Sequence, residues 1–169
     1  LLDVVDPQRL FGRYVYVSST SPVFVEHFRR YAQAMRERFH LGPGAQVIEI
    51  GSNDGVLLRH FQEAGLRVLG IDPARAIAQE ATRRGIQTLP EFFSPELAHR
   101  LRAQGWRPAL ICANNVFAHA DDLQAIVQGV AHLLAPEGVF VFEVSYLLDV
   151  VEQGLFDTMY HEHLSYHSV

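Results

Sequence analysis

The residue types best suited to binding chemistry lie in two segments that each follow an apolar run. Residues 47–55 read Val-Ile-Glu-Ile-Gly-Ser-Asn-Asp-Gly, and Asp72 ends a second apolar run about twenty residues later. A glycine turn brings backbone N–H groups close to a ligand, and an acid at this spacing accepts hydrogen bonds from ribose hydroxyls. The pattern predicts a site for an adenosine-containing cofactor, with contacts from Glu49, Gly51, Ser52, Asn53, Gly55, Asp72 and Pro73.

The glycine spacing separates the candidate cofactors. A dinucleotide site needs Gly-x-Gly-x-x-Gly so that backbone can approach a pyrophosphate, whereas here Asn53 takes the second glycine position and Asp54 adds a negative charge. A phosphate-free cofactor with a cationic centre fits better, and S-adenosylmethionine is one. The alternatives are a glycine turn without any cofactor and, least favoured, an NAD-linked dehydrogenase.

These residues need a scaffold, and strands alternate with helices across residues 46–144. Apolar runs predict strands, and helical patterns ended by glycine or proline separate them. Ser21-Pro22 is a good start for a preceding helix, and residues 1–20 read as extended or irregular. The expected strands are 46–50, 67–71, 86–89, 109–113 and 138–144, and the expected helices are 21–41, 56–64, 74–84, 95–104 and 121–134. The rhythm indicates an α/β domain with a parallel sheet covered by helices on both faces.

Ligands in such a sheet bind beyond the carboxyl ends of the strands. Phe92, Asn114, Asn115 and His119 would all project there. The two amides could bind the methionine part of the cofactor, or they could stabilise a turn. A histidine near a helix start is usually a surface or capping residue, and only its position on this edge makes His119 a candidate.

Tyr160-His-Glu-His163 packs four hydrogen-bonding or ionisable side chains into four residues. A histidine here could act as a general base, because imidazole titrates near neutrality. An extended segment would put His161 and His163 on one side, whereas a helical one would bring Tyr160 and His163 onto the same face. A metal site and a plain polar surface segment are the alternatives.

Composition limits the class of protein. A chain of 169 residues with a net charge of −5 has no electrostatic footprint for nucleic acid. One cysteine excludes a disulfide framework, and no stretch resembles a signal peptide or a membrane span, so we expect a cytoplasmic protein with no membrane association. The chain lacks an initiator Met and reads as one domain, residues 1–169, of something longer.

Four segments together resemble a known family. They are Leu10-Phe-Gly-x-Tyr14-Val-Tyr16-x-Ser-Ser-Thr-Ser21, Glu49-Ile-Gly-Ser-Asn-Asp-Gly55, Ala113-Asn-Asn-Val-Phe-Ala-His119 and Tyr160-His-Glu-His-Leu-Ser165. They look like the sugar C-methyltransferases of antibiotic deoxysugar pathways, and the match covers nearly the whole chain. The resemblance implies a Rossmann-like class I methyltransferase domain and S-adenosylmethionine as cofactor. The implied partner is a small-molecule, nucleotide-linked (TDP-type) 4-keto-deoxysugar that is methylated on a ring carbon beside its ketone.

The resemblance also implies roles for the polar residues. His163 would be the base that forms an enolate, Glu162 and Tyr160 would orient it or the sugar, and Tyr14 and His119 would bind the keto oxygen or shuttle the proton. Residues 145–169 would then form the catalytic segment. The family carries a zinc module before this region and further strands and a second domain after it, so we expect no metal here and a sheet without its last strands. The alternatives are a methyltransferase with another small-molecule acceptor and a binding module that is inactive without the missing domains.

Overall fold

Five parallel strands form one sheet in the computed structural model, which describes residues 5–12, 14–160 and 162–168. The strands are β1 (Gln46–Ile50), β2 (Arg67–Ile71), β3 (Thr88–Leu89), β4 (Leu110–Asn114) and β5 (Val139–Glu143). Their order in the sheet is β3-β2-β1-β4-β5, so the chain starts in the middle and reverses direction after β3. The register sets Gln46 beside Arg67, and Val47 beside both Val68 and Leu110. This confirms the predicted parallel α/β sheet.

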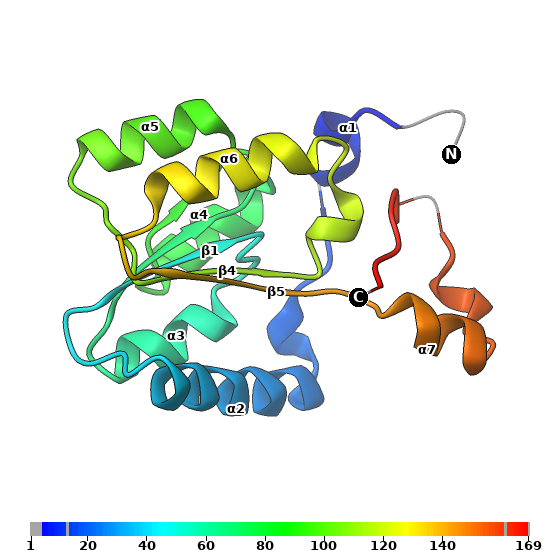
Figure 1. Ribbon diagram of the computed structural model, residues 1–169, viewed down its shortest axis with the longest axis horizontal. Helices are drawn as coiled ribbons and strands as arrows, with labels where there is room; N and C mark the ends of the chain where they lie inside the picture. Colours follow the sequence, from blue (N-terminus) through cyan, green and yellow to red (C-terminus); the bar gives the residue numbers. More distant parts are fainter. Residues whose placement is uncertain (1–4, 13, 161, 169) are drawn as a thin grey trace.

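Helices cover both faces of the sheet (Figure 1). Helices α2 (Pro22–Arg38) and α3 (Val56–Glu63) lie on one face, and α5 (Pro95–Ala103) and α6 (Leu123–Leu133) lie on the other. Helix α4 (Arg75–Arg83) packs near β3. Side-chain caps fix where three helices start, because Ser21, Ser94 and Asp122 each accept a hydrogen bond from a backbone N–H of the first turn.

Each face of the sheet carries its own apolar core. On the α2 and α3 side, Phe61 and Leu57 are fully buried against Val47, and on the α5 and α6 side Leu101 and Leu133 pack with Ile48. Neighbouring residues of β1 thus point to opposite cores, as the two-residue period of a strand requires. Every strand residue of β1, β2 and β4 except Gln46 and Arg67 is buried, which explains the continuous apolar runs.

The only tryptophan lies at the amino ends of the strands. Trp106 comes just before β4 and is 5% exposed, and the guanidinium carbon of Arg67, the first residue of β2, lies 4.2 Å from the centre of its ring. A cation above an aromatic face is attracted by the ring quadrupole. This contact closes the end of the sheet opposite to the glycine turn.

The terminal segments differ from the sequence-based expectation. Residues 1–20 were expected to be irregular, but α1 (Pro7–Phe11) and a 3-10 turn (Ser18–Thr20) lie within them. The Asp6 side chain accepts a hydrogen bond from Gln8 N–H, which makes one capped turn stable enough to form. Beyond β5 the chain adds α7 (Leu147–Glu152) and another 3-10 turn (Phe156–Thr158), neither of which was expected.

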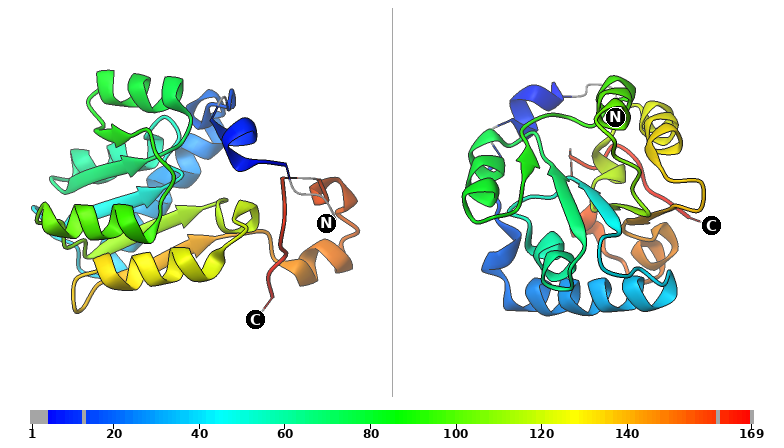
Figure 2. Two further views of the ribbon diagram at one scale, coloured as in Figure 1. Left: turned by 90° about the horizontal axis from the view of Figure 1, so that it is seen from above. Right: turned by 90° about the vertical axis from the view of Figure 1, so that its left-hand side faces the viewer.

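Both terminal segments lie beside the carboxyl edge of the sheet (Figure 2).

The β3 strand is shorter than the expected 86–89, because Ile86 N–H bonds to Ala81 O and so closes the end of α4. Among the described helices, none combines the length and apolar character that a membrane span requires.

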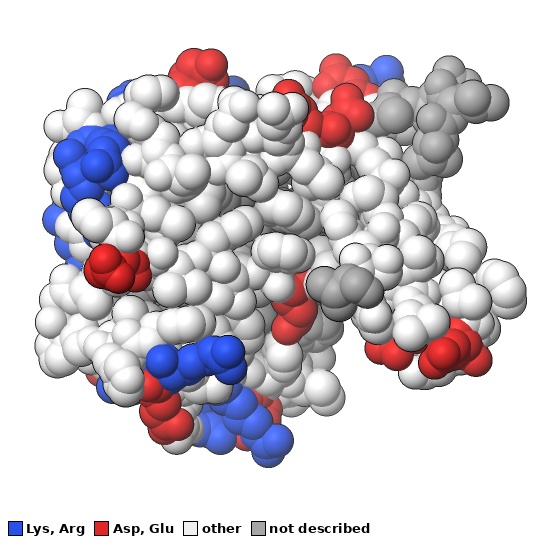
Figure 3. Space-filling model, viewed as in Figure 1, with Lys and Arg blue, Asp and Glu red and all other residues white. Residues whose placement is uncertain are grey.

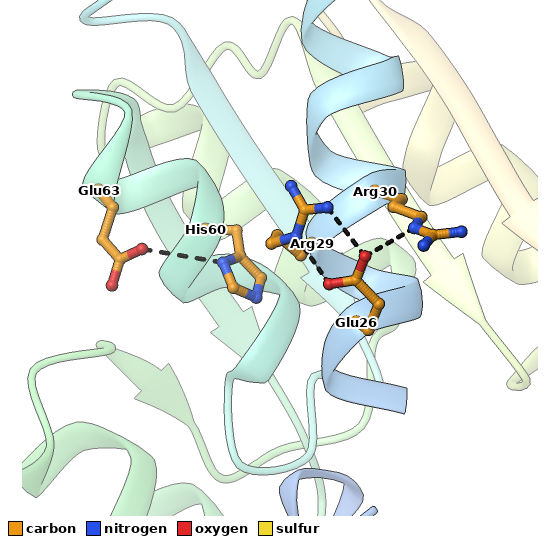
Figure 4. A network of polar contacts seen from close by, with 5 residues as sticks. All are labelled: Glu26, Arg29, Arg30, His60 and Glu63. Atoms are coloured by element: carbon orange, nitrogen blue, oxygen red, sulfur yellow. Dashed lines mark hydrogen bonds and ion pairs between the residues drawn. The ribbon is translucent and has the colours of Figure 1, made fainter. Parts of the chain in front are cut away.

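The outer surface carries no large patch of one charge on the face seen in Figure 3, where arginines and acids are interspersed. One such mixture lies on α2, where Glu26 pairs with Arg29 and Arg30 (Figure 4). These two guanidinium groups lower the pKa of the exposed Glu26 carboxyl to about 2.

A cavity of about 350 Å³ between α2 and α3 is lined by residues such as Arg36 and His60, and it shares no residue with the site predicted from the sequence.

Candidate active site

The glycine turn after β1 forms the floor of the site. Gly51 and Gly55 have φ of 70° and 76°, the left-handed region that glycine adopts at no steric cost. A side chain on Gly51 would also overlap Val116, which follows β4. The turn therefore lies close against the neighbouring loop, and only glycine fits at this position.

Asp72 ties the end of β2 to this turn. Its two carboxylate oxygens accept hydrogen bonds from Asn53 N–H and Ala74 N–H, each at 2.8 Å. The residue is 7% exposed, and burial raises the pKa of the carboxyl group. Each oxygen retains a second lone pair, so both can still accept a hydrogen bond from a ligand hydroxyl.

Several buried polar atoms around the turn are without a hydrogen-bond partner among the described residues. Such atoms are costly inside a protein unless a ligand or solvent satisfies them. They include the amide oxygen and nitrogen of Asn114, the Ser52 hydroxyl, and one carboxylate oxygen each of Glu49 and Asp54. This set of acids, amides and hydroxyls suits a ligand with ribose hydroxyls, an amino acid end and a positive charge. The residues thus fit S-adenosylmethionine.

Glu49 behaves differently from the other acids. It lies on β1, is 4% exposed, and burial together with the nearby Asp72 charge raises the pKa of its carboxyl well above the usual value. Burial therefore disfavours the charged form of the Glu49 side chain at the floor of the site.

A column of rings stands beside the glycine turn and is the most distinctive feature of the site. Phe11 stacks on His119 with ring centres 5.4 Å apart, His119 on His163 at 5.1 Å, and Tyr160 lies 4.0 Å from His163. The four rings come from α1, from the turn after β4 and from the segment after α7. Only the fold brings them together.

Backbone hydrogen bonds hold the C-terminal part of this column. Leu164 N–H donates to Ala118 O at 2.6 Å, next to His119, and His163 N–H donates to Tyr160 O at 3.0 Å. The bond from His163 to Tyr160 brings these two residues together, and their rings lie side by side. The extended alternative was therefore wrong and the helical one was nearer to the structure, while His161 lies outside the described residues.

Tyr14 reaches the same region from the N-terminal segment. Burial, and then the nearby Glu162, Tyr160 and Asp72, raise the pKa of its phenol, which is half-buried. Burial, and then Glu162, raise the pKa of the Tyr160 phenol as well. Both phenols remain protonated at neutral pH and can donate a hydrogen bond.

The remaining sequence candidates occupy the same edge with varied surroundings. Asn115 has a positive φ of 56° and directs its amide nitrogen toward Glu143, 3.5 Å away. The Asn115 side chain therefore contacts Glu143, at the end of β5. Pro73 and Phe92 are partly exposed in the segments that follow β2 and β3. No group of three or more His, Cys, Asp or Glu side chains within the described part of the chain is placed to hold a metal ion.

Two contributing residues were missed by the sequence reasoning. Phe11 packs on His119, and its place in the Leu-Phe-Gly segment was the available signal. Gly70, in the middle of β2, has no signal of its own. A side chain there would overlap the Ser52 hydroxyl and come within 2.7 Å of the Thr88 hydroxyl, so Gly70 lets the glycine turn approach the sheet.

His119 should make the fold sensitive to acid. Burial, and then the neighbouring His163, lower its pKa from 6.5 to about 4, so protonation favours the unfolded chain. The stability from this effect is complete above about pH 6.5 and is lost as the pH falls toward 4. We expect the melting temperature of His119→Phe to fall less than that of the wild type between these pH values. His40→Asn, in the exposed turn after α2, is the control, and an unchanged slope in His119→Phe would contradict the assignment.

Several known proteins resemble this chain in sequence. Residues 24–168 match the model of a family described as a methyltransferase domain. The C-methyltransferase NovU of Streptomyces niveus is 40% identical over 169 residues, which is 100% of this chain and 40% of NovU. A ubiquinone biosynthesis O-methyltransferase of Methylobacterium sp. (strain 4-46) is 29% identical over 146 residues, or 82% of this chain and 55% of that protein. The chain thus spans only about half the length of these relatives.

Solved structures with a similar fold support the assignment of the architecture. YcgJ of Bacillus subtilis aligns with a TM-score of 0.63 at 15% identity, covering 83% of this chain and 63% of YcgJ. A putative S-adenosyl-L-methionine-dependent methyltransferase of Methanococcus maripaludis aligns with a TM-score of 0.59 at 14% identity, covering 81% and 66%. At these identities the likeness concerns the fold. The chain belongs to the methyltransferase-domain family and has the Rossmann-like α/β fold of the class I, S-adenosylmethionine-dependent methyltransferases.

Proposed function

We propose that this chain is the methyl-transfer domain of an enzyme that methylates a ring carbon beside the ketone of a nucleotide-linked 4-keto-deoxysugar. The observation that carries the proposal is the contact of two imidazoles and a phenol, His119, His163 and Tyr160, beside the glycine turn. The relation to NovU, a C-methyltransferase by name, supports carbon as the methyl acceptor. The resemblance to deoxysugar enzymes supports the sugar.

A carbon acceptor requires more from the protein than an oxygen acceptor does. A C–H bond beside a ketone must lose its proton before the carbon becomes a nucleophile. The enzyme therefore needs a base near that proton, a donor for the enolate oxygen, and firm positioning of both reactants. When bound, S-adenosylmethionine supplies an electrophilic methyl group on a cationic sulfur.

The ring column offers these groups. His163 is half-buried and is our candidate base, because a neutral imidazole near the acceptor can take the proton. His119 stays neutral at pH 7 because its pKa is lowered to about 4, so it donates or accepts a hydrogen bond without adding positive charge. The Tyr14 and Tyr160 phenols remain protonated and can donate to the keto oxygen as charge develops on it. Glu162, whose charge raises the pKa of both phenols, is our candidate to orient His163 or the sugar.

The test uses the full-length enzyme and separates binding from chemistry. Affinity for S-adenosylmethionine is measured by calorimetry, and a panel of 4-keto-deoxysugar nucleotides is then assayed for methyl transfer. In parallel, each sugar is incubated in D₂O without the methyl donor. We expect deuterium to replace hydrogen on the carbon beside the ketone, because proton removal precedes methyl transfer.

The outcomes distinguish the candidate functions. Cofactor binding with exchange and transfer on a sugar nucleotide supports the proposal. Binding with transfer to a hydroxyl of another small molecule, without exchange, would identify a different methyltransferase. If the full-length protein binds the cofactor but transfers a methyl group to neither kind of acceptor, it is a binding module and the proposal is wrong.

A further inference from the structure

We infer that Asn53 is a positioning residue whose side chain clamps the N-terminal strap, residues 14–20, onto the cofactor loop and thereby places Tyr14 in the active site. The inference deepens the proposed function and rests on it for the role of Tyr14. It predicts that the cofactor and the sugar side of the site are coupled through this one amide.

The amide of Asn53 makes three hydrogen bonds to backbone groups. Its Oδ1 accepts hydrogen bonds from Ser18 N–H and Asp54 N–H, both at 3.0 Å, and its Nδ2 donates to Tyr16 O at 2.9 Å. The bonds to residues 16 and 18 span 37 and 35 positions of sequence. The side chain therefore faces the strap, and the backbone N–H of the same residue bonds to Asp72.

Among the described residues, few other contacts hold the strap near its middle. Val15 is 89% exposed and Tyr16 is 44% exposed, so apolar burial contributes little there. The Thr20 hydroxyl bonds to Val17 O, which lies within the strap itself. Phe11, which stacks on His119, anchors the chain three residues before Tyr14. Tyr14 thus lies between an aromatic anchor and the Asn53 clamp.

Asparagine is well suited to this position. Its φ of 49° lies in the left-handed region, which glycine adopts freely and asparagine tolerates better than most residues. A glycine would keep the turn but lose the clamp. An aspartate would keep the acceptor for Ser18 but could not donate to Tyr16 O. The amide meets both the backbone requirement and the two hydrogen bonds.

The test breaks the clamp from each side in the full-length enzyme. Asn53→Gly removes the side chain and keeps the left-handed turn. Ser18→Pro removes the N–H donor, and the fold tolerates proline here because Val17 has φ −122° and ψ 116°, the conformation favoured before proline. Ser18→Ala, which keeps the N–H, and His40→Gly, at another left-handed residue (φ 51°) outside the site, are the matched controls.

Hydrogen–deuterium exchange of peptides covering residues 14–20 is the first readout and needs no acceptor. Both clamp variants should exchange roughly tenfold faster than wild type in this segment, since each loses one or two hydrogen bonds, and the controls should not. S-adenosylhomocysteine, bound on the cofactor loop, should slow exchange of the strap in wild type but not in Asn53→Gly.

Kinetics are the second readout. Asn53→Gly should lower kcat/KM for the sugar nucleotide roughly 10- to 100-fold, as misplacement of a catalytic group does, while KM for S-adenosylmethionine changes less than about threefold.

Unchanged exchange in both clamp variants would overturn the clamp. Faster exchange with unaltered kcat/KM would overturn the positioning role. If wild type transfers no methyl group to any sugar nucleotide, the proposed function fails, while strap exchange with and without S-adenosylhomocysteine still decides whether Asn53 couples the two segments.

Discussion

The His163→Asn variant of the full-length enzyme should lose methyl transfer by roughly 100- to 10,000-fold in kcat, the usual contribution of a general base. Asparagine keeps a polar side chain of similar reach but cannot take a proton at neutral pH. Deuterium exchange at the sugar carbon should fall by a similar factor, since both depend on the same proton removal. Affinity for S-adenosylmethionine should stay within a few-fold of wild type, because His163 belongs to the ring column and not to the cofactor loop.

His99→Asn is the matched control, because His99 lies exposed on α5 and contacts His132 rather than the site. Its turnover should equal that of wild type. If His163→Asn keeps full exchange and full transfer, another group removes the proton. His119 would then be the next candidate, with the same pair of measurements.

Replacing Asp72 by alanine should weaken binding of S-adenosylmethionine and S-adenosylhomocysteine roughly 100-fold or more. The variant removes an acceptor for the ribose hydroxyls, and a hydrogen bond to a charged group contributes about 1.5–3 kcal/mol. It also releases the N–H groups of Asn53 and Ala74, which the carboxylate now holds at 2.8 Å. Calorimetry with both ligands measures the loss directly.

Asp121→Ala serves as the control, since Asp121 is an exposed acid at the same edge while its neighbour Asp122 caps α6. Wild-type affinity is expected for this variant. Should Asp72→Ala bind both ligands as tightly as wild type, Asp72 would be a structural residue of the turn and would have no contact with ribose.

The sheet was predictable because its strands are buried on both faces. Val47–Ile50 and Val68–Ile71 read as apolar runs that only Glu49 and Gly70 interrupt, and each is followed by a turn residue or an acid that marks the carboxyl end. The helix starts were equally local, since Ser21, Ser94 and Asp122 lie next to the helices they cap. Apolar runs and capping residues involve only neighbouring positions, so a short stretch of sequence contains the whole signal.

The sequence indicated which residues belong to the candidate site, but not how their side chains are arranged. His119 and His163 are 44 positions apart, and their stacking depends on where η2 (Phe117–His119) meets the C-terminal segment through Leu164 and Ala118. The Asn53 clamp likewise joins residues 35 or more positions apart. Such contacts are set by tertiary packing, and the relative position of Tyr160 and His163 was left open because a four-residue polar segment has no period of its own.

The position of Trp106 simplifies the study of all these variants. The indole is buried at the amino ends of the strands, under Arg67, whereas the site substitutions proposed above lie at or near the carboxyl ends. Its ultraviolet emission in the isolated chain therefore reports whether the domain is intact and is insensitive to what occupies the opposite edge. A variant with native emission but altered turnover has lost a function and not its folding.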